Sequence, residues 1–396
     1  MKILIICQHY WPEQFRITDI GESLVNKGCK VTVLCGLPNY PSGKISNDYK
    51  HHKNRVEIRN GVKILRVNEF PRRNNVFSRL INYYSYPYFA TKYLKKNKIE
   101  FDVVLAIGLS PIMMVRPAIY LKNKYKCKII LYEMDLWPES LLAGGIKKNS
   151  LIYNYYKKIS AQIYCKFDKI LVTTNEHISY IKNLKHCENL DISYLPQYAE
   201  SIFEDNDFNN DNNDLINLLF AGNIGKAQDV DTIINAASLL QNESKFKFHI
   251  VGDGSELSKV RRLANKLQVS NVTFYGQKPL DEMLAFYKLA DVMLVTLDNK
   301  SFANITIPGK IQSYMAAGKP IIGAVNGSTA NLIADNGIGF VCPSGDYQSL
   351  AALIKGLDLS VLKSLGKKSA DIYFRNFRKE HFIDSLYNYL LVFADK

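Results

Sequence analysis

The chain alternates short apolar runs with segments of helix length, and it does so in two separate series. An apolar run of five or six residues is typical of a buried strand, and the helix-length segment that follows is the crossover that parallel strands need. The pattern therefore predicts two doubly wound α/β domains, each built on a parallel sheet. The first series predicts strands at Lys2–Cys7, Lys30–Leu34, Lys63–Val67, Phe101–Ile107, Lys128–Tyr132 and Lys169–Thr173. The second series predicts strands at Leu215–Phe220, Phe246–Val251, Val272–Tyr275 and Val292–Thr296.

The two series are separated by Glu200–Asp214, ESIFEDNDFNNDNND, which is rich in Asn and Asp and poor in core-forming residues. Such a composition favours a linker or a surface loop. The 396 residues suffice for two domains of roughly 150–200 residues each. We predict a first domain at residues 1–198, a linker at 199–214, a second domain at 215–375 and a final helix at 376–396 that packs back on the first domain. Two such domains facing each other would form a central cleft at the carboxyl ends of their strands, where ligands bind in these folds.

Positive charge is concentrated in the first half of the chain. Residues 1–200 hold 31 Lys and Arg against 16 Asp and Glu, a net +15, whereas residues 201–396 hold 20 against 21, a net −1. This asymmetry predicts an anionic partner for the first half. The charge is accompanied by no zinc-finger spacing, RNA-recognition signature or heptads with a basic region, so we expect no nucleic-acid partner. An anionic membrane surface or a phosphorylated lipid fits the charge better.

Two segments of the first half interleave aromatic and basic residues. Asn74–Lys98 reads NNVFSRLINYYSYPYFATKYLKKNK, and Leu151–Lys169 is a weaker version with three tyrosines and the pair Lys157-Lys158. Aromatic rings at headgroup depth beside cations are typical of an interfacial helix, which Pro87 would kink in the first segment. The alternative is a pair of helices that pack against the core, with their basic ends exposed to solvent.

The sequence offers no segment that predicts membrane insertion or secretion. The longest uncharged stretches, such as Val103–Val115, fall short of the ~20 residues that a spanning helix needs. The apolar run Ile3–Cys7 is a buried strand rather than a signal peptide. The seven cysteines are scattered and never spaced as C-x-x-C, which is typical of reduced core residues. We therefore predict a cytoplasmic protein held peripherally on the inner face of the cell membrane.

The segment Asn304–Pro320, NITIPGKIQSYMAAGKP, predicts a loop followed by a short helix that Pro308 begins and Gly318 ends. Lys310 falls in the first turn of this helix. The first turn leaves backbone N–H groups unpaired and carries partial positive charge, so it attracts anions, and a lysine there adds a full charge. The segment favours a phosphate-bearing ligand, and the alternative is an ordinary helix with a solvated lysine.

Two glycine turns in the second half support the same ligand. The turns Gly222-Asn-Ile-Gly225 and Gly252-Asp-Gly254 each follow a predicted strand and precede a helix. Glycines at such turns let backbone N–H groups approach a pyrophosphate closely. Either turn alone could be only a tight turn, but both together with Lys310 favour a nucleotide diphosphate. We assign donor binding to Asn223, Gly225, Gly252 and Lys310, with Lys278 as a further candidate.

Several longer motifs point to one known family. They are HYWPE at His9–Glu13, GLPNYPSGK at Gly36–Lys44, DLWPES at Asp135–Ser140, LLFAGNIGKAQ at Leu218–Gln228, IVGDGSE at Ile250–Glu256 and IPGKIQSYMAAGKPII at Ile307–Ile322. On these motifs the chain resembles, nearly end to end, GT-B glycosyltransferases of family 4 from bacterial capsule, O-antigen and colanic-acid gene clusters. Within that subgroup it is similar to N-acetyl-fucosamine transferases.

The resemblance implies a specific reaction. It implies a GT-B fold of two Rossmann-like domains and a retaining transfer of a sugar, an N-acetylated amino sugar in the nearest relatives. The donor would be a nucleotide-diphosphate sugar, UDP-linked, and the acceptor a polyprenyl-diphosphate-linked saccharide in surface polysaccharide biosynthesis. No metal or other cofactor would be needed.

The chain departs from the family pattern at four donor-side positions. Family members have an arginine after the first glycine turn and a lysine a few residues on, where this chain has Asn223 and Gln228. Their two glutamates, eight residues apart, would fall near Ile305 and Ser313. Because both carboxylates are missing, we expect Lys310 to meet the diphosphate charge and Ser313, a weaker hydrogen-bonding group, to replace the ribose-binding glutamate.

Candidate residues of the first domain lie after two predicted strands. The resemblance implies an acidic residue near the acceptor hydroxyl, and we assign this catalytic role to Asp135 first and Glu133 second. The alternative for Asp135 is a helix cap. After the first strand, Glu13 and Arg16 are candidates for acceptor or phosphate binding, and the alternative for Arg16 is a solvated position at a helix start.

No metal site is predicted. Asp229-Val-Asp231 matches a metal-binding D-x-D, but it opens a predicted helix, where carboxylates commonly cap. The histidines, including the pair His51-His52, lack the ligand spacing of a zinc site, and there is no P-loop. Two alternatives to a transferase stay open: a GT-B nucleotide-sugar 2-epimerase that needs no acceptor, and a non-catalytic nucleotide-sugar-binding subunit.

Overall fold

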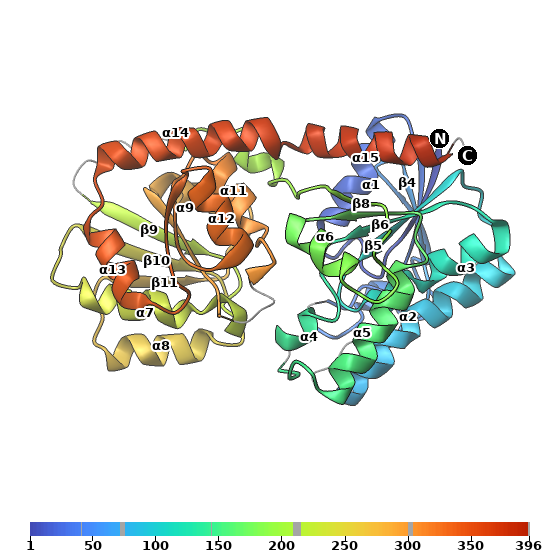
Figure 1. The fold of residues 1–396 in the computed structure, drawn as a ribbon, viewed down its shortest axis with the longest axis horizontal. Helices are drawn as coiled ribbons and strands as arrows, with labels where there is room; N and C mark the ends of the chain where they lie inside the picture. Colours follow the sequence, from blue (N-terminus) through green and yellow to red (C-terminus); the bar gives the residue numbers. More distant parts are fainter. Residues whose placement is uncertain (41, 72–75, 144, 209–214, 300–303, 395–396) are drawn as a thin grey trace. The chain divides into compact units, whose positions relative to one another are not determined.

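The computed structural model describes residues 1–40, 42–71, 76–143, 145–208, 215–299 and 304–394. Its contacts divide the chain into two compact units (Figure 1). The first unit consists of Met1–Leu195 together with Ile383–Lys396, and the second unit is Pro196–Phe382. Each unit is an α/β fold with helices on both faces of its sheet (Figure 1).

The described residues of the first unit form an eight-stranded sheet in the order β3-β4-β2-β1-β5-β6-β7-β8. All neighbouring strands are parallel except β3 and β4, which pair antiparallel. The central strands are fully buried apolar runs, as expected for a sheet covered on both faces. The strands are β1 (Lys2–Ile6), β2 (Lys30–Cys35), β3 (Val56–Arg59), β4 (Val62–Arg66), β5 (Val103–Gly108), β6 (Ile129–Glu133), β7 (Lys169–Val172) and β8 (Ile192–Tyr194).

The helices of the first unit follow its strands as crossovers. The long helix α2 contains Pro87 near its middle and packs on α3. The pair Lys95-Lys96 lies in its last turn, where cations are favourable. The helices are α1 (Arg16–Asn26), α2 (Val76–Lys96), α3 (Arg116–Tyr125), α4 (Ser140–Ala143), α5 (Leu151–Tyr164) and α6 (Asn175–Lys182).

The second unit has a six-stranded, fully parallel sheet in the order β11-β10-β9-β12-β13-β14. Separate hydrophobic clusters fill its two faces, so the unit is doubly wound as predicted. Its strands are β9 (Ile216–Ala221), β10 (Phe246–Val251), β11 (Val272–Gly276), β12 (Val292–Thr296), β13 (Ile321–Ala324) and β14 (Gly339–Cys342). Its helices are α7 (Val230–Leu239), α8 (Leu257–Lys266), α9 (Met283–Leu289), α11 (Lys310–Ala316), α12 (Gly327–Asp335), α13 (Tyr347–Lys355) and α14 (Leu359–Asn376).

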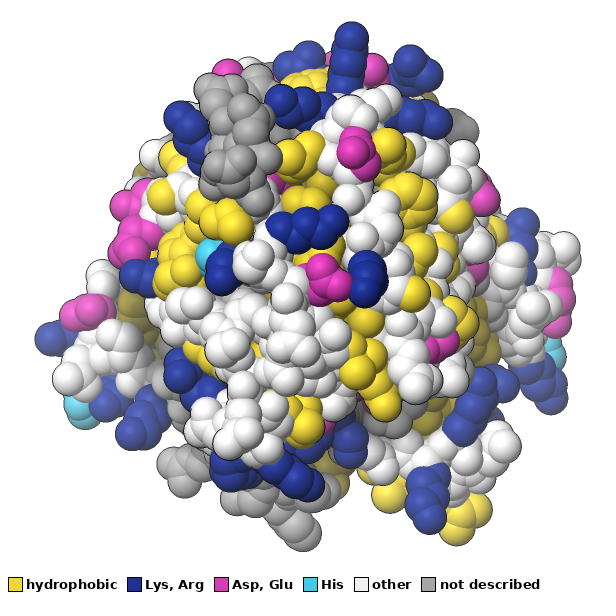
Figure 2. Space-filling view, turned by 90° about the vertical axis from the view of Figure 1, so that its left-hand side faces the viewer, with side chains coloured by type: hydrophobic (Ala, Val, Ile, Leu, Met, Phe, Trp, Pro, Cys, Tyr) yellow, Lys and Arg dark blue, Asp and Glu magenta, His cyan; other side chains and the backbone are white. Residues whose placement is uncertain are grey.

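Charge is mixed on the surface of the second unit. On the face shown in Figure 2, basic and acidic side chains are interspersed with hydrophobic and neutral ones. This agrees with the near-neutral net charge of residues 201–396.

The described part of the segment predicted as a linker packs into the second unit. Phe203 and Phe208 are buried and contact the ring of Tyr287 at centroid distances of 4.3 and 5.9 Å. The backbone N–H of Ala199 donates to the Tyr373 hydroxyl at 3.0 Å. Ala199 and the two phenylalanines are buried and anchor this otherwise partly exposed segment to the core of the second unit. Residues 209–214 lie outside the described residues.

The last helix, α15 (Lys379–Ala394), begins in the second unit and continues into the first. Within the first unit, Asp384 forms an ion pair with Lys27. The Lys169 amine lies 5.0 Å from the centroid of the Tyr389 ring. The helix therefore contributes side chains to the fold of the first unit.

Candidate functional site

Two glycines bring the carboxyl ends of β9 and β10 together. Gly222 follows β9 with φ 136°, and Gly252 follows β10 with φ 140°, a region that side chains rarely adopt. A Cβ on Gly252 would lie 1.8 Å from the Gly222 carbonyl oxygen. A Cβ on Gly222 would lie 3.1 Å from Nζ of Lys310. The structure therefore brings Gly252, Gly222 and Lys310 to one place, at the sheet edge where ligands bind in such folds.

Lys310 is a buried amine without a hydrogen bond. It is the first residue of α11, and its Nζ has no hydrogen-bond partner among the described residues. The amine lies 3.9 Å from the centroid of the buried Phe220 ring. Burial lowers the pKa of the Lys310 amine to about 7, because the charged form loses its hydration. An ammonium group has three hydrogen-bond donors, so this site can accept an anion without first breaking a contact.

Asn223 and Gly225 lie beside this position. The side-chain amide of Asn223 donates to Oε1 of Gln228 at 3.3 Å. A Cβ on Gly225 would lie 2.7 Å from Nδ2 of Asn223, so the turn closes tightly over the amide. Asn223 itself is exposed and can be reached by a ligand.

Lys278 is not part of this group among the described residues. Its amine donates to Oε2 of Glu282 at 2.8 Å, four residues further on. The side chains of this pair are about a third and a half exposed. Such an exposed i, i+4 pair needs no ligand to explain it.

Ser313 is already hydrogen-bonded to a carboxylate. The Ser313 hydroxyl, buried one turn after Lys310, donates to Oε2 of Glu200 at 2.7 Å. Glu200 comes from the segment predicted as a linker. The Glu200 carboxylate therefore lies beside Ser313, the position where the family pattern has a glutamate and this sequence has a serine. No local sequence pattern signals this contact, because the two residues are 113 positions apart.

In the first unit, Glu133 ends β6 and is fully buried. Its Oε1 accepts a hydrogen bond from the Tyr164 hydroxyl at 2.6 Å, and its Oε2 has no hydrogen-bond partner in the described residues. Gly108, at the end of β5, leaves the space that this carboxyl fills, since a Cβ there would lie 1.8 Å from Oε2. Burial raises the pKa of Glu133 well above its usual range, and the nearby Asp135 raises it further.

Asp135 is more accessible than Glu133. It lies two residues beyond β6 and is half-buried. Burial raises the pKa of Asp135, and a hydrogen bond with the backbone of Ser110 opposes this rise. Helix α4 begins only at Ser140, so Asp135 does not cap it. Of the two predicted catalytic carboxylates, Asp135 is the more exposed.

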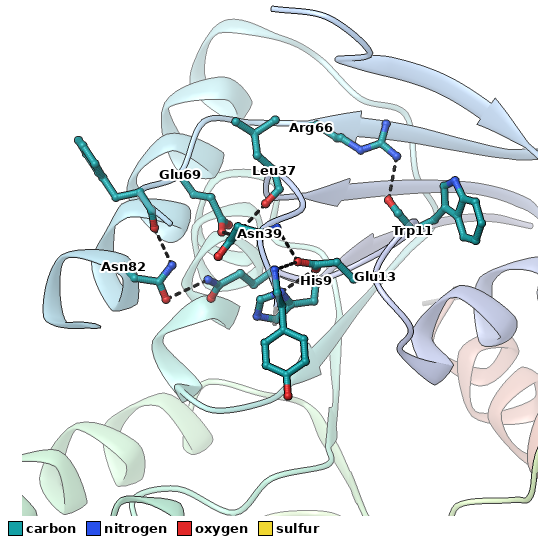
Figure 3. Close-up of polar contacts among 11 residues, drawn as sticks. His9, Trp11, Glu13, Leu37, Asn39, Arg66, Glu69 and Asn82 are labelled. Carbon is teal, nitrogen blue, oxygen red and sulfur yellow. Dashed lines mark hydrogen bonds and ion pairs between the residues drawn. The ribbon is translucent and has the colours of Figure 1, made fainter. Parts of the chain in front are cut away.

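Glu13 lies in a polar network at the carboxyl end of β1 (Figure 3). Its Oε1 accepts hydrogen bonds from the backbone N–H groups of Asn39 and Tyr40 at 2.7 and 2.6 Å. Its Oε2 lies 2.8 Å from Nδ1 of His9. The carboxylate is buried and occupied by these three groups, so it is not free to bind an acceptor phosphate. Its contacts fit an internal role toward His9.

Arg16 begins α1 and is half-buried. Its positive charge lowers the pKa of the Tyr132 hydroxyl, although burial raises that pKa more strongly. Tyr132 immediately precedes Glu133 at the carboxyl end of β6. Arg16 is therefore near the end of the sheet that carries the predicted catalytic carboxylates.

His9 is not among the residues predicted from the sequence, because the histidines lack the spacing of a zinc site. The signal was present in the HYWPE motif, where a histidine precedes a glutamate by four residues directly after a strand. Only the structure shows that the turn between them brings the two side chains into contact (Figure 3).

The described residues show no metal cluster and no membrane span. No group of three or more His, Cys, Asp or Glu side chains among them could hold a metal ion. In the D-x-D segment, Asp229 accepts from the Thr232 hydroxyl at 2.7 Å and Asp231 pairs with Lys259. Within the same residues, no helix is both long and apolar enough to cross a bilayer.

Comparison with known proteins supports the expected fold and chemistry. Residues 201–359 match the family described as Glycosyl transferases group 1. The chain is 28% identical over 329 residues to the probable glycosyltransferase WbjE of Pseudomonas aeruginosa, covering 78% of this chain and 80% of WbjE. It is 24% identical over 355 residues to WcaI of Escherichia coli K12, named for a glycosyl transferase of colanic acid biosynthesis, covering 80% and 82% of the two chains. The structure of HepE from Anabaena in complex with UDP and glucose superposes with a TM-score of 0.71 at 13% identity, covering 98% and 99% of the chains. The predicted fold class, two Rossmann-like units of the GT-B type, is confirmed.

Proposed function

We propose that this chain, a glycosyltransferase of group 1, transfers a sugar from a UDP-linked donor to a lipid-linked saccharide during synthesis of a surface polysaccharide such as a capsule or O-antigen. The relative WcaI is named for colanic acid biosynthesis, and HepE, whose fold is similar, was solved with UDP. The resemblance to N-acetyl-fucosamine transferases favours an N-acetylated amino sugar as the transferred group. It also favours retention at the anomeric carbon.

The observation that carries this proposal is the buried, unpartnered amine of Lys310 between Phe220 and Gly222. Desolvating an amine without a hydrogen bond is unfavourable, so such an arrangement is expected where a ligand completes it. The donor diphosphate supplies both the charge and the acceptors that the amine lacks. As the bond to the sugar breaks, negative charge grows on the diphosphate, and a preorganised ammonium stabilises it without a metal ion.

The neighbouring turn supplies further donor contacts. The backbone N–H groups of Gly222 and Gly252 already donate to the carbonyls of Val251 and Gly276, at 2.9 and 2.8 Å, so among these glycines we assign the phosphate contact to the N–H of Gly225. The exposed amide of Asn223 adds a side-chain donor. We retain Lys278 as a weaker donor-side candidate, since its pair with Glu282 would have to open.

Glu200 and Ser313 together provide the carboxylate that the family pattern lacks at residue 313. Glu200 is half-buried, and Ser313 holds one of its oxygens at 2.7 Å. A carboxylate accepts hydrogen bonds from two sugar hydroxyls far better than a serine can. We assign recognition of donor hydroxyls to this pair, one helical turn from Lys310.

In the first unit, we assign the catalytic role to Asp135 rather than to the inaccessible Glu133. Asp135 lies at the same sheet end as Arg16, His9 and Glu13. Its half-buried carboxylate can hydrogen-bond an acceptor hydroxyl or stabilise positive charge on the sugar. Arg16 is the candidate for a phosphate of the acceptor.

The lipid-linked acceptor implies attachment to a membrane, and helix α5 provides a surface for it. Leu151 is 89% exposed, and Ile152 and Tyr155 on the same helix end are also exposed. Next to them lies a cavity of about 580 Å³ lined by lysines on α5, just after α5 and after α6. No ion pair to these lysines is found in the described part of the chain. They are Lys157, Lys158, Lys166 and Lys185.

An apolar helix end beside unneutralised lysines fits a bilayer with anionic headgroups. Within the predicted segment Asn74–Lys98, the described helix is α2 (Val76–Lys96), where Leu80, Ile81 and Tyr88 are also exposed. Two of its rings, Tyr83 and Tyr86, are buried, and those of Tyr84, Phe89 and Tyr93 are half-buried. The helix therefore has both a core face and an exposed apolar face. We propose that the first unit binds the anionic inner membrane surface through α5 and α2.

A panel of nucleotide sugars, screened by thermal shift and then for product, tests the proposed function. A ligand that binds the native state raises its melting temperature by mass action. The proposal predicts stabilisation by UDP-sugars and release of UDP only when an acceptor is present. Conversion of the donor without an acceptor would instead indicate an epimerase, and binding without any turnover would indicate a non-catalytic subunit.

A further inference from the structure

The first unit brings two cysteines together, although they are 22 residues apart in the sequence. Both are free thiols, and Sγ of Cys165 lies 3.0 Å from Sγ of Cys187. Cys165 directly follows α5, and Cys187 lies in the segment between α6 and β8. The two sulfurs of a disulfide are about 2.05 Å apart, so a bond between these cysteines needs an approach of about 1 Å.

Backbone hydrogen bonds hold both cysteines in this contact. The N–H of Cys165 donates to the carbonyl of Ala161 at 3.1 Å, and the N–H of Cys187 donates to the carbonyl of Leu184 at 3.0 Å. Sγ of Cys187 also lies 3.6 Å from the carbonyl oxygen of Ala161, one turn before Cys165 on α5. The segment after α6 is therefore packed against the end of α5, and the fold keeps the two thiols within reach of each other.

The two thiols differ in their access to solvent. Cys165 is half-buried and lines the cavity of about 580 Å³ that also holds four lysines. Reactive cysteines in proteins are partly exposed and lie in electropositive surroundings, and Cys165 has both properties. Cys187 is buried, and burial together with the contact to Cys165 raises the pKa of its thiol. An oxidant therefore reaches Cys165 first, and Cys187 is a protonated thiol beside it.

We propose that Cys165 and Cys187 form a reversible oxidation site, where Cys165 reacts with a hydroperoxide and Cys187 then closes a disulfide. In the first step the sulfur of Cys165 attacks one peroxide oxygen and the O–O bond breaks. The other oxygen leaves with the thiol proton, as water or an alcohol, and Cys165 becomes a sulfenic acid. The sulfur of Cys187 then attacks the sulfur of Cys165, the S–O bond breaks, and the hydroxyl group leaves as water with the proton of Cys187. The two electrons that the thiols lose reduce the hydroperoxide.

The disulfide joins two walls of the lysine-lined cavity. One wall consists of Lys157 and Lys158 on α5 and Lys166 just after it, and the other contains Lys185 and His186 after α6. A covalent link between the walls restricts the motion of the second wall relative to the first. This inference does not depend on the transfer of a sugar, so it can be tested on the ligand-free protein.

Peptide mass spectrometry of the full chain tests the proposal. The reduced protein is treated with a small excess of hydrogen peroxide, and the remaining thiols are blocked with N-ethylmaleimide. We expect the peptides that carry Cys165 and Cys187 to be joined, with a mass two hydrogens below their sum, and dithiothreitol to separate them again. In the oxidised protein, the backbone amides of residues 183–187 should exchange their hydrogens more slowly than in the reduced protein. Unchanged exchange at these residues would contradict the constraint on the cavity wall.

Two serine variants test the order of the steps. Cys187→Ser should stop the reaction at the sulfenic acid of Cys165, which dimedone labels. Cys165→Ser should leave Cys187 unlabelled by dimedone, because this thiol is buried. Dimedone on Cys187 of the second variant, with none on Cys165 of the first, would reverse the assigned roles and overturn the proposal.

Cys127 is the matched control within the same chain. It is half-buried like Cys165, but its sulfur contacts no other cysteine among the described residues. We expect N-ethylmaleimide to modify Cys127 in the oxidised protein, and we expect no cross-linked peptide to contain it. A peroxide-treated wild type in which Cys165 remains a thiol, or is oxidised to a sulfinic acid without joining Cys187, would refute the site.

Discussion

Lys310 holds its amine where water does not reach it, and no carboxylate among the described residues pairs with it. Its pKa of about 7, against an ordinary 10.5, means that between these pH values the folded state binds fewer protons than the unfolded state. Protonation therefore favours unfolding, and stability should rise as pH increases through this window. At neutral pH the unfavourable contribution is on the order of a few kcal/mol.

Replacing this lysine should stabilise the protein and remove its ligand. We expect Lys310→Met to raise the melting temperature of the ligand-free protein by several degrees, roughly 2–4 °C per kcal/mol for a domain of this size. The same variant should lose the further rise that UDP gives the wild type. Thermal unfolding with and without UDP measures both effects.

Lys319 offers a matched control for that experiment. It is also buried, but its amine donates to the carbonyls of Phe208 and Ala290, both at 2.6 Å. Lys319→Met should lower the melting temperature, because two buried carbonyls would lose their donor at a cost of about 1–3 kcal/mol. It should keep the UDP effect. A Lys310→Met variant that behaves like Lys319→Met would show that the Lys310 amine is structural.

Substitutions of the two carboxylates at the end of β6 and just beyond it should have different effects on turnover. Asp135→Asn should reduce kcat about 10²-fold or more while leaving the UDP effect intact, because the proposed role places its charge near the reacting centre, where it is worth several kcal/mol. Glu133→Gln should be close to wild type in kcat, because Glu133 is enclosed and an amide has its shape. Near-normal turnover of Asp135→Asn would remove it from the mechanism.

At the scale of elements, the close approach of β9 and β10 depends on glycine. Gly252→Ala would place a methyl group 1.8 Å from the Gly222 carbonyl oxygen, which only a backbone shift can relieve. Gly345 also has a positive φ, 78°, but a Cβ there meets nothing within 4 Å. Gly345→Ala should therefore cost about 1 kcal/mol from its backbone conformation alone. Gly252→Ala should lower the free energy of unfolding by more than Gly345→Ala does, and it should also weaken UDP binding. Denaturant unfolding and UDP titration compare the two, and equal losses would contradict the account.

The strands that could be predicted are those whose side chains are buried on both faces. An apolar run such as Ile3–Cys7 carries its own signal. The hairpin of β3 and β4 was missed because β3 is half exposed, with Val56 and Ile58 facing solvent. Its turn, Asn60-Gly61, adopts positive φ at both residues, and this Asn-Gly signal was available in the sequence.

The residues of the candidate site also divide into those that the sequence predicts and those that only the fold brings together. Lys310 and its glycine turns could be predicted because a helix start and two strand ends mark them locally. Glu200 could not, because a carboxylate within a polar segment looks like a linker until the fold brings it to Ser313. The pairing of His9 with Glu13 also depends on a loop conformation that composition does not specify.

At the scale of the whole molecule, the positive charge of residues 1–200 should make membrane binding dependent on salt. We expect the wild type to sediment with vesicles that contain anionic phospholipid and to be released as ionic strength rises. Reversing Lys157 and Lys158 to glutamate should abolish this binding. The same double change at the exposed pair Lys367-Lys368 in the second unit should not alter it. Equal binding by both variants, or indifference of the wild type to anionic vesicles, would contradict the proposed attachment.

Our main inference is that the Lys310 ammonium, together with the amide groups of Asn223 and Gly225, holds the leaving diphosphate without a metal ion. A crystal structure of the protein with UDP, grown without divalent cations, tests it most directly. We expect a phosphate oxygen within hydrogen-bond distance of Nζ of Lys310, beside Gly222 and Gly252. Phosphates bound elsewhere, with the Lys310 amine still enclosed and unpaired, would contradict it.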